Sequence, residues 1–168
     1  MHQVYIGIGS NLDDPLNQVK TALEELKRHA KFKLLACSSI YKSKALITSK
    51  NTRQPDYINA VVKLETNSNP NELLSLLQEI EKQHNKVQQY HWGPRTLDLD
   101  ILLFDDLSIA SPTLTIPHSE IAKRDFVLFP LFDIDPLLDI PELGKLKPLV
   151  EKHSKENLQL IESLTDLK

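Results

Sequence analysis

The order in which the spacing of apolar residues changes between residues 4 and 104 constrains the fold of this chain most strongly. Four segments have the composition of β-strands, at residues 4–9, 32–44, 57–66 and 96–104. Two segments carry leucines at helical spacing, and each begins where a capping residue precedes a proline, at Asp14-Pro15 and Asn69-Pro70. The predicted order is β-α-β-β-α-β, a ferredoxin-like α/β sandwich with both helices on one face of the sheet.

The segment at residues 57–66 alternates between an apolar and a mixed face. The apolar face carries Ile58, Ala60, Val62 and Leu64, and the other face carries Tyr57, Asn59, Val61 and Lys63. A tyrosine and an amide on the open face of a sheet can stack on a flat heterocycle and hydrogen-bond to it. A solvated sheet face explains the same two residues without any ligand, and from these residues alone it is the favoured interpretation.

The rest of the chain is less regular. Polar stretches at residues 45–54 and 84–96 predict long loops, which are often functional in compact domains. Beyond residue 104 we expect an extended piece around 114–117, a helix within 125–132 and a terminal helix in the last 25 residues or so. The length of 168 residues predicts a single domain, 1–168.

The composition limits which partners the chain can bind and in which cell compartment we expect it. Lys and Arg total 20 against 23 Asp and Glu, a formal net charge of -3, which argues against binding to duplex nucleic acid. An RNA-binding sheet is a more distant alternative that the charge also opposes. The single Cys37 allows no internal disulfide, and no signal-like or membrane-spanning stretch is recognisable. We therefore expect a cytoplasmic protein without a membrane partner.

Asp98 and Asp100 are the most informative polar pair. In an extended strand they point to the same side about 6.5 Å apart. At that separation they repel by roughly 2.5 kcal/mol at an effective dielectric near 20, but by only about 0.6 kcal/mol in bulk water. The pair is therefore either solvated or shares a cation, and Mg²⁺ prefers such hard oxygens. Arg95 offers a simpler salt bridge with Asp98, so the spacing alone leaves both alternatives open.

Other polar motifs are weaker. Gly7-Ile8-Gly9-Ser10-Asn11 lacks the third glycine of a dinucleotide fingerprint and is interpreted as a tight turn between a strand and a helix. No Walker-type loop is present in the sequence. Gln78 and Glu81 lie one turn apart on the second helix, where an ordinary polar surface explains them. His118, Arg124 and Phe126 would suit a phosphate and a ring, although scattered surface residues are the commoner case.

Four motifs together resemble the 6-hydroxymethyl-7,8-dihydropterin pyrophosphokinase family of folate biosynthesis. They are Tyr5-Ile6-Gly7-Ile8-Gly9-Ser10-Asn11-Leu12, Gln54-Pro55-Asp56-Tyr57-Ile58-Asn59-Ala60, Trp92-Gly93-Pro94-Arg95-Thr96-Leu97-Asp98-Leu99-Asp100-Ile101 and Thr115-Ile116-Pro117-His118. They follow the family's order and cover about residues 4–136. The resemblance implies the ferredoxin-like fold and the transfer of the β,γ-diphosphate of ATP to the pterin hydroxymethyl group, with release of AMP.

The resemblance also implies roles for individual residues. Catalytic roles fall on Lys86, Arg95, Asp98 and Asp100, and the two aspartates would bind two Mg²⁺ ions. The pterin would be held by Ser43, Leu46, Tyr57, Asn59, Trp92 and Phe126. The ATP site would be lined by Gln78, Glu81, His91, Trp92, Arg95, Ile101, Thr115, His118 and Arg124. The implied partners are ATP and a reduced pterin, and we expect a monomer or a weak homodimer.

The chain departs from the family's usual pattern upstream of Trp92. Where the family commonly carries several arginines, this sequence has Lys86-Val87-Gln88-Gln89-Tyr90-His91, and Thr113 stands where an arginine is frequent. A lysine replaces a bidentate guanidinium with a point charge, so phosphate binding is weakened. We expect activity to be retained, either with lower ATP affinity or turnover or with other cations that compensate for the missing arginines. The alternative is a ferredoxin-like pterin- or nucleotide-binding module with weakened catalysis.

Overall fold

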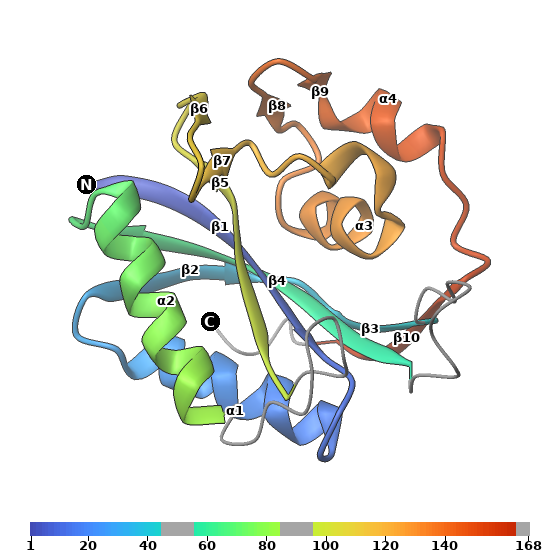
Figure 1. Ribbon diagram of the computed structural model, residues 1–168. Helices are drawn as coiled ribbons and strands as arrows, with labels where there is room; N and C mark the ends of the chain where they lie inside the picture. The colour runs from blue at the N-terminus through green and yellow to red at the C-terminus, as the bar shows by residue number, and fades with distance from the viewer. Residues whose placement is uncertain (45–55, 85–95, 164–168) are drawn as a thin grey trace.

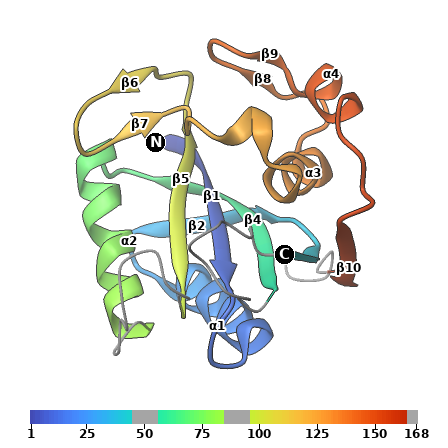
Figure 2. The same ribbon diagram turned by 45° about the vertical axis from the view of Figure 1, so that its right-hand side comes forward.

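The computed structural model describes residues 1–44, 56–84 and 96–163, and its centre is an antiparallel sheet. The strand order is β10-β3-β4-β1-β5, and β2 also pairs with β4. β5 and β10 therefore lie at opposite edges of the sheet (Figure 2). The strands are β1 (His2–Ser10), β2 (Phe32–Cys37), β3 (Ile40–Ser43), β4 (Tyr57–Thr66), β5 (Asp98–Phe104) and β10 (Leu158–Glu162).

Two helices, α1 (Pro15–Arg28) and α2 (Pro70–His84), pack on one side of this sheet, and α3 (Asp125–Ile134) packs on the other (Figure 1). The predicted β-α-β-β-α-β order and the ferredoxin-like fold are confirmed. α2 begins with a capping box in which the Asn69 side chain accepts from the Glu72 N–H at 2.9 Å and the Glu72 side chain accepts from the Asn69 N–H. Asp14 occupies the capping position of α1, but its side chain makes no capping hydrogen bond.

The two faces of β4 divide as the sequence predicts. Ile58, Ala60, Val62 and Leu64 belong to the core under α1 and α2, whereas Val61 belongs to a second core under α3. Two tyrosines on the α3 side tie that helix to the sheet. The Tyr41 hydroxyl donates to Asp133 at 2.6 Å, and the Tyr5 hydroxyl donates to Asp135. Lys63 also donates to Asp135, at 3.0 Å.

The structure differs from the prediction in two places. The strand expected at residues 32–44 is two strands, because Ser38 leaves the regular ladder and its hydroxyl accepts from the Val61 N–H at 2.8 Å. The last described element is β10 rather than a helix, and the short α4 (Leu146–Glu151) is the helix within the last 25 residues. β10 forms because its backbone pairs with the edge of β3.

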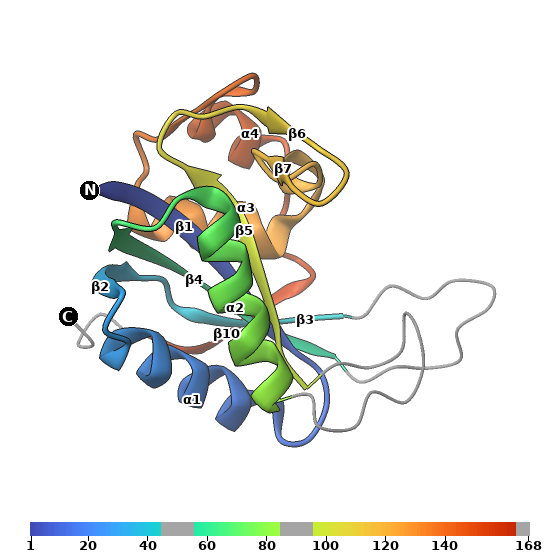
Figure 3. The same ribbon diagram turned by 60° about the vertical axis from the view of Figure 1, so that its left-hand side comes forward.

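The remaining elements are short and lie beyond the central sheet. The hairpin of β6 (Ile109–Ala110) and β7 (Thr115–Ile116) lies at the same end of the molecule as α4 (Figure 3). A second hairpin pairs β8 (Asp139–Ile140) with β9 (Gly144–Lys145), and a 3₁₀ turn, η1 (Ile121–Lys123), precedes α3. Among the described residues, no helix has the length and apolar character needed to cross a membrane.

Candidate active site

The two aspartates of the predicted metal pair stand at the start of β5. Asp98 is half-buried and Asp100 is exposed, while Leu99 between them is buried in the core on the opposite face. The two carboxylates therefore share the sheet face that α1 and α2 do not cover, as the alternation of a strand requires. In register with them on β1 are two glycines, Gly9 beside Asp98 and Gly7 beside Asp100.

The pair suits one kind of metal better than others. Within the described ranges, no third His, Cys, Asp or Glu side chain completes a cluster around it. Mg²⁺ is commonly held by one or two carboxylates while water and phosphate oxygens fill the rest of its shell. The donor set of Asp98 and Asp100 thus fits Mg²⁺ that arrives with a phosphate ligand, and it does not resemble a closed structural metal site.

A bulge in β5 limits the length of the strand that presents polar side chains on the sheet face opposite α1 and α2. The register pairs Ile6 with Ile101 and Tyr5 with Leu103, which leaves Leu102 as an extra residue. As a result Leu102 and Leu103 both belong to the core under α3. The carbonyl oxygen of Leu102 accepts from the backbone N–H of His118 at 3.0 Å, and this bond brings the segment after β7 back to β5.

The side chains expected to hold a pterin meet on β3 and β4. Asn59 is buried, and its Nδ2 donates to the Ser43 hydroxyl at 2.8 Å. The same Nδ2 lies 3.5 Å from the Tyr57 carbonyl oxygen, which can only accept, so the amide nitrogen points toward this side. Its Oδ1 therefore points the other way, toward β1. Asn59 is directly in register with Gly9, and Tyr57 is partly exposed on the same face.

Helix α2 contributes a contact to the edge of β5. The backbone N–H of Leu99 donates to Glu81 Oε2 at 2.9 Å, so a side chain of the helix accepts from the outer edge of the strand. One turn further, His84 fixes the end of α2 against α1 through Gln18 at 2.6 Å and Glu25 at 2.9 Å. Gln78 is exposed on α2. Glu81 therefore holds the strand that carries both aspartates.

The residues after β7 form a second group. His118 is half-buried, and its Nδ1 accepts from the Glu120 N–H at 3.2 Å, so in the neutral ring the proton is on Nε2, which can donate. The guanidinium of Arg124 lies 5.6 Å from the ring centre of Phe126 at the start of α3. Thr115 is exposed in β7. This group offers an N–H donor, a cation and an aromatic ring on one short stretch of chain.

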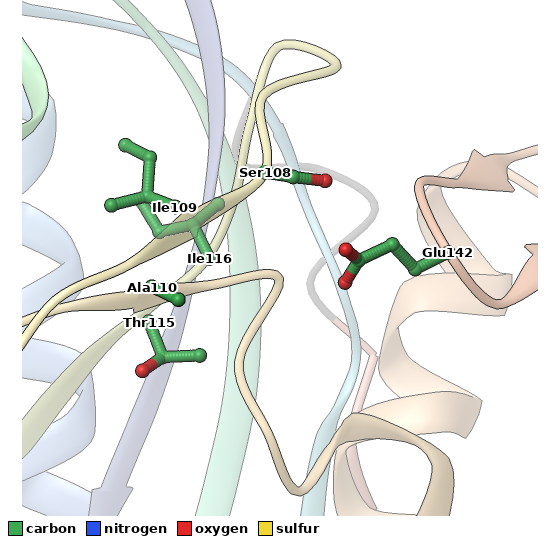
Figure 4. Close-up of a pocket in the computed structure, with 6 residues that line it drawn as sticks. All are labelled: Ser108, Ile109, Ala110, Thr115, Ile116 and Glu142. Atoms are coloured by element: carbon green, nitrogen blue, oxygen red, sulfur yellow. The ribbon is translucent and has the colours of Figure 1, made fainter.

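Two shallow cavities lie away from the aspartate pair. One, of about 160 Å³, lies between the β6–β7 hairpin, which contributes Thr115, and Glu142, which points toward it from the opposite side (Figure 4). The other, of about 170 Å³, is lined by residues of β3 and β10 that include Ser43. Both are smaller than the 300–1,000 Å³ typical of small-molecule sites. We therefore place the candidate site at Asp98 and Asp100, whose carboxylates can bind a metal ion.

Apart from the residues of α2 and of the segment after β7 described above, the predicted site residues fall into three sets. Tyr57 and Asn59 of β4 and Asp98 and Asp100 of β5 lie on one face of the sheet, on either side of β1, with Ser43 of β3 beside Asn59. Ile101 has its side chain in the core under α1 and α2. Leu46, Lys86, His91, Trp92 and Arg95 lie outside the described residues.

Neither Gly7 nor Gly9 is among the predicted site residues. Gly7 and Gly9 lie within β1, in agreement with the strand predicted at residues 4–9, and the turn expected at their motif lies after it instead. β1 continues through Ser10, and the turn to α1 follows it. The signal that could have identified them is their spacing: glycines at i, i+2 on β1 are in register with aspartates at i, i+2 on β5.

These features define the class of the protein: a ferredoxin-like α/β sandwich with a polar site on the sheet face left open by α1 and α2. The family model for 7,8-dihydro-6-hydroxymethylpterin-pyrophosphokinase (HPPK) matches residues 5–136. This chain belongs to that family, as its motifs predicted. The pyrophosphokinase function in folate biosynthesis expected from the sequence is confirmed at the level of the family.

Relatives extend over nearly the whole chain. The 2-amino-4-hydroxy-6-hydroxymethyldihydropteridine pyrophosphokinase of Haemophilus influenzae is 41% identical over 158 residues, covering 94% of this chain and 97% of that protein. The protein of the same name from Pseudomonas aeruginosa is 42% identical over 150 residues, covering 89% and 91%. A crystal structure of wild-type Plasmodium falciparum HPPK-DHPS with SDX-DHP matches with a TM-score of 0.71 at 16% identity. That match covers 96% of this chain but only 47% of the longer chain, and it shows the fold.

Proposed function

We propose that this chain transfers the β,γ-diphosphate of ATP to the hydroxymethyl group of 6-hydroxymethyl-7,8-dihydropterin and depends on Mg²⁺. The hydroxyl oxygen of the pterin forms a bond to the β-phosphorus, the bond from that phosphorus to the oxygen of AMP breaks, and the hydroxyl proton passes to solvent. The observation that carries the proposal is the alignment of Asn59, Gly9 and Asp98 across three strands of one sheet face.

The pterin belongs at the β4 end of the line formed by Asn59, Gly9 and Asp98. The Oδ1 of Asn59 can accept from a ring N–H, and its orientation is fixed by the bond from Nδ2 to Ser43. The ring of Tyr57 offers an aromatic face beside it, and we assign Phe126 of α3 to the opposite face of the heterocycle. The sequence assigns Leu46 and Trp92 to the same ligand. A buried amide of fixed orientation rejects rings that lack the matching donor.

The triphosphate belongs at the β5 end. Asp98 and Asp100 would hold Mg²⁺, which supplies neutralisation of phosphate charge and lowers the pKa of a hydroxyl that it touches. Arg124 offers a cation and His118 an N–H donor to the phosphates, and Glu81 supports the strand through Leu99. We assign Gln78, Ile101 and Thr115 to the nucleotide, together with Lys86, His91, Trp92 and Arg95, which lie outside the described residues.

The chemistry explains why no strong general base is needed among these side chains. Diphosphoryl transfer proceeds mainly through in-line positioning of the two substrates and stabilisation of spreading negative charge. A sheet positions groups more rigidly than a loop does, so substrates that bind at fixed points on adjacent strands approach each other in a defined geometry. The main role of this chain is therefore to hold two substrates side by side.

One assay tests the proposal. The protein is mixed with ATP, Mg²⁺ and 6-hydroxymethyl-7,8-dihydropterin, and the released nucleotide and the pterin product are identified by mass spectrometry. We expect AMP and a pterin diphosphate in equal amounts, and no turnover when Mg²⁺ is removed with a chelator. Release of ADP would indicate transfer of a single phosphoryl group, and absence of turnover would favour a binding module. Two Mg²⁺ ions, a cytoplasmic location and a monomer or weak homodimer also stay predictions.

A further inference from the structure

The η1 turn connects the two residues that we assign to the phosphates, His118 and Arg124. The chain is fixed before the turn, because the backbone N–H of His118 donates to the Leu102 carbonyl oxygen of β5 at 3.0 Å. Arg124 follows the turn directly, with an extended backbone, and is half-buried. Helix α3 begins at the next residue. The direction in which the Arg124 side chain leaves the backbone therefore depends on the turn in front of it.

His153 of the C-terminal segment holds the other end of this turn. Its Nε2 lies 2.9 Å from the carbonyl oxygen of Ala122, two residues before Arg124. A carbonyl oxygen can only accept, so Nε2 carries a proton and donates it. Both ring nitrogens of a protonated histidine are donors, so the bond is present whether or not the ring is charged.

The backbone of the turn leaves the Ala122 carbonyl available. Within the described residues, the backbone N–H groups at this turn donate to the carbonyls of His118, Glu120 and Ile121. The last carbonyls of a helical turn have no partner inside it. A side chain from another part of the fold can therefore hold the turn at Ala122 without competing with the hydrogen bonds that form it.

His153 is itself firmly placed. It follows α4, and its backbone N–H donates to the Val150 carbonyl oxygen at 3.0 Å. α4 lies against α3 (Figure 2), and Leu146 and Val150 are buried in the core that the two helices share. Two residues after the histidine, the Lys155 ammonium lies 5.2 Å from the ring centre of Phe129 in α3. The imidazole is thus carried by a segment that is packed on α3, and it can serve as a fixed support for η1.

We propose that His153 is a positioning residue for Arg124: its Nε2–H holds the η1 turn and so fixes the guanidinium that we assign to the phosphates. This inference rests on the proposed function and deepens it, because it gives the C-terminal segment a part in nucleotide binding. Loss of the bond frees the turn at Ala122, while the packing of α3 keeps Phe126 in place. The expected effect therefore falls on ATP and not on the pterin.

The test compares two amide side chains at position 153. His153→Gln places its N–H close to the position of Nε2, whereas the side chain of His153→Asn is one bond shorter and does not reach Ala122. Full loss of a charge-assisted hydrogen bond costs about tenfold or more in affinity, and a displaced guanidinium keeps part of it. We therefore expect His153→Asn to raise KM for ATP about three- to tenfold and to leave KM for the pterin within about twofold. His153→Gln should stay within about twofold of the wild type for both substrates.

Two controls separate positioning from a general loss of stability. Tyr41→Phe loosens the opposite end of α3 by removing the bond to Asp133, and it should leave both KM values within about twofold although it lowers Tm. In an Arg124→Ala background, His153→Asn should change the ATP KM by less than about twofold, because its effect passes through the guanidinium.

Thermal unfolding checks the fold of every variant. His153→Leu, which has no donor, should behave as His153→Asn does and replaces it if the asparagine variant does not fold. If neither of these variants folds while His153→Gln does, the role of the bond is structural and the inference is overturned.

Binding of an ATP analogue with a methylene bridge between the α- and β-phosphorus, measured with Mg²⁺ by isothermal titration calorimetry, separates this inference from the proposed function. If the wild type binds the analogue but releases no AMP from ATP, the proposed reaction fails. A three- to tenfold loss of affinity in His153→Asn that is restored in His153→Gln still supports the positioning role. A wild type that binds no nucleotide contradicts both ideas.

Four results would overturn the inference alone. They are equal nucleotide affinity in the wild type and His153→Asn, equal losses in His153→Asn and His153→Gln, a loss in Tyr41→Phe as large as that in His153→Asn, and an undiminished effect of His153→Asn when Arg124 is already alanine.

Discussion

The hydrogen bond between Tyr41 and Asp133 predicts a measurable loss of stability in Tyr41→Phe. Tyr41 is 5% exposed in β3, and its hydroxyl donates to an aspartate near the end of α3 at 2.6 Å. The bond joins residues 92 positions apart and fastens α3 to the sheet. Burial, and then the carboxylate of Asp133, raise the pKa of Tyr41 above its ordinary value, so the hydroxyl is a donor at neutral pH.

The size of the loss follows from the nature of the acceptor. Hydrogen bonds to charged groups contribute about 1.5–3 kcal/mol. Asp133 is exposed and regains water when the hydroxyl is removed, so we expect the lower end, about 1.5 kcal/mol. For a chain of this length such a change lowers Tm by about 3–6 °C. Asp133→Ala should remove the same bond from the other side.

Urea unfolding of a double-mutant cycle checks this reasoning. The free energy of unfolding is measured for the wild type, Tyr41→Phe, Asp133→Ala and the double variant. If the bond carries the effect, Tyr41→Phe costs less than about 0.5 kcal/mol once Asp133 is already alanine. An equal cost in both backgrounds would refute the reasoning, because the loss would then come from packing of the ring rather than from the hydroxyl.

Three further outcomes follow from individual contacts. Burial raises the pKa of the Cys37 thiol to about 12. The thiol of the unfolded chain ionises near pH 9, so above this pH unfolding releases a proton and the free energy of unfolding falls as the pH rises. Cys37→Ala should reduce this pH dependence by up to about 1.4 kcal/mol per pH unit, measured by urea unfolding at alkaline pH. Glu81→Ala should cost about 1–3 kcal/mol of stability by removing the acceptor for the Leu99 N–H, whereas Glu81→Gln keeps an acceptor and should cost less than half as much. Asp98→Asn and Asp100→Asn should each lower kcat at least about a thousandfold with an unchanged circular dichroism spectrum, and retained turnover in either would exclude a metal role for that residue.

Local rules were sufficient to predict the main architecture. The strict alternation of residues 57–66 assigned Ile58, Ala60, Val62 and Leu64 to the core under α1 and α2, and the proline-led helix starts at Pro15 and Pro70 were correct. The core that α3 forms on the other face was not predicted. The same period-2 rule put Asp98 and Asp100 on one face. These features depend on neighbours within a few residues, so a sequence contains the information needed to find them.

Features that depend on distant partners could not be predicted. β10 is a short segment with a mostly exposed Leu160, and only the free edge of β3, more than a hundred residues earlier, makes it a strand. The bulge at Leu102 was hidden within an apolar run, because a run of apolar residues does not show where the register slips. For the same reason the position of Gly9 between Asn59 and Asp98 is visible only in the register of the three strands.

The central claim is that a pterin and a metal-bound triphosphate lie side by side over β1, and nuclear magnetic resonance tests it directly. Paramagnetic Mn²⁺ replaces Mg²⁺, an unreactive ATP analogue is bound, and the hydroxymethyl proton signal of the bound pterin is recorded. With roughly 10 Å between Asn59 and Asp98, we predict strong broadening of this signal in the wild type and much weaker broadening in Asp98→Asn. A signal that stays as sharp with Mn²⁺ as with Mg²⁺, while both ligands are shown to be bound, would contradict the claim.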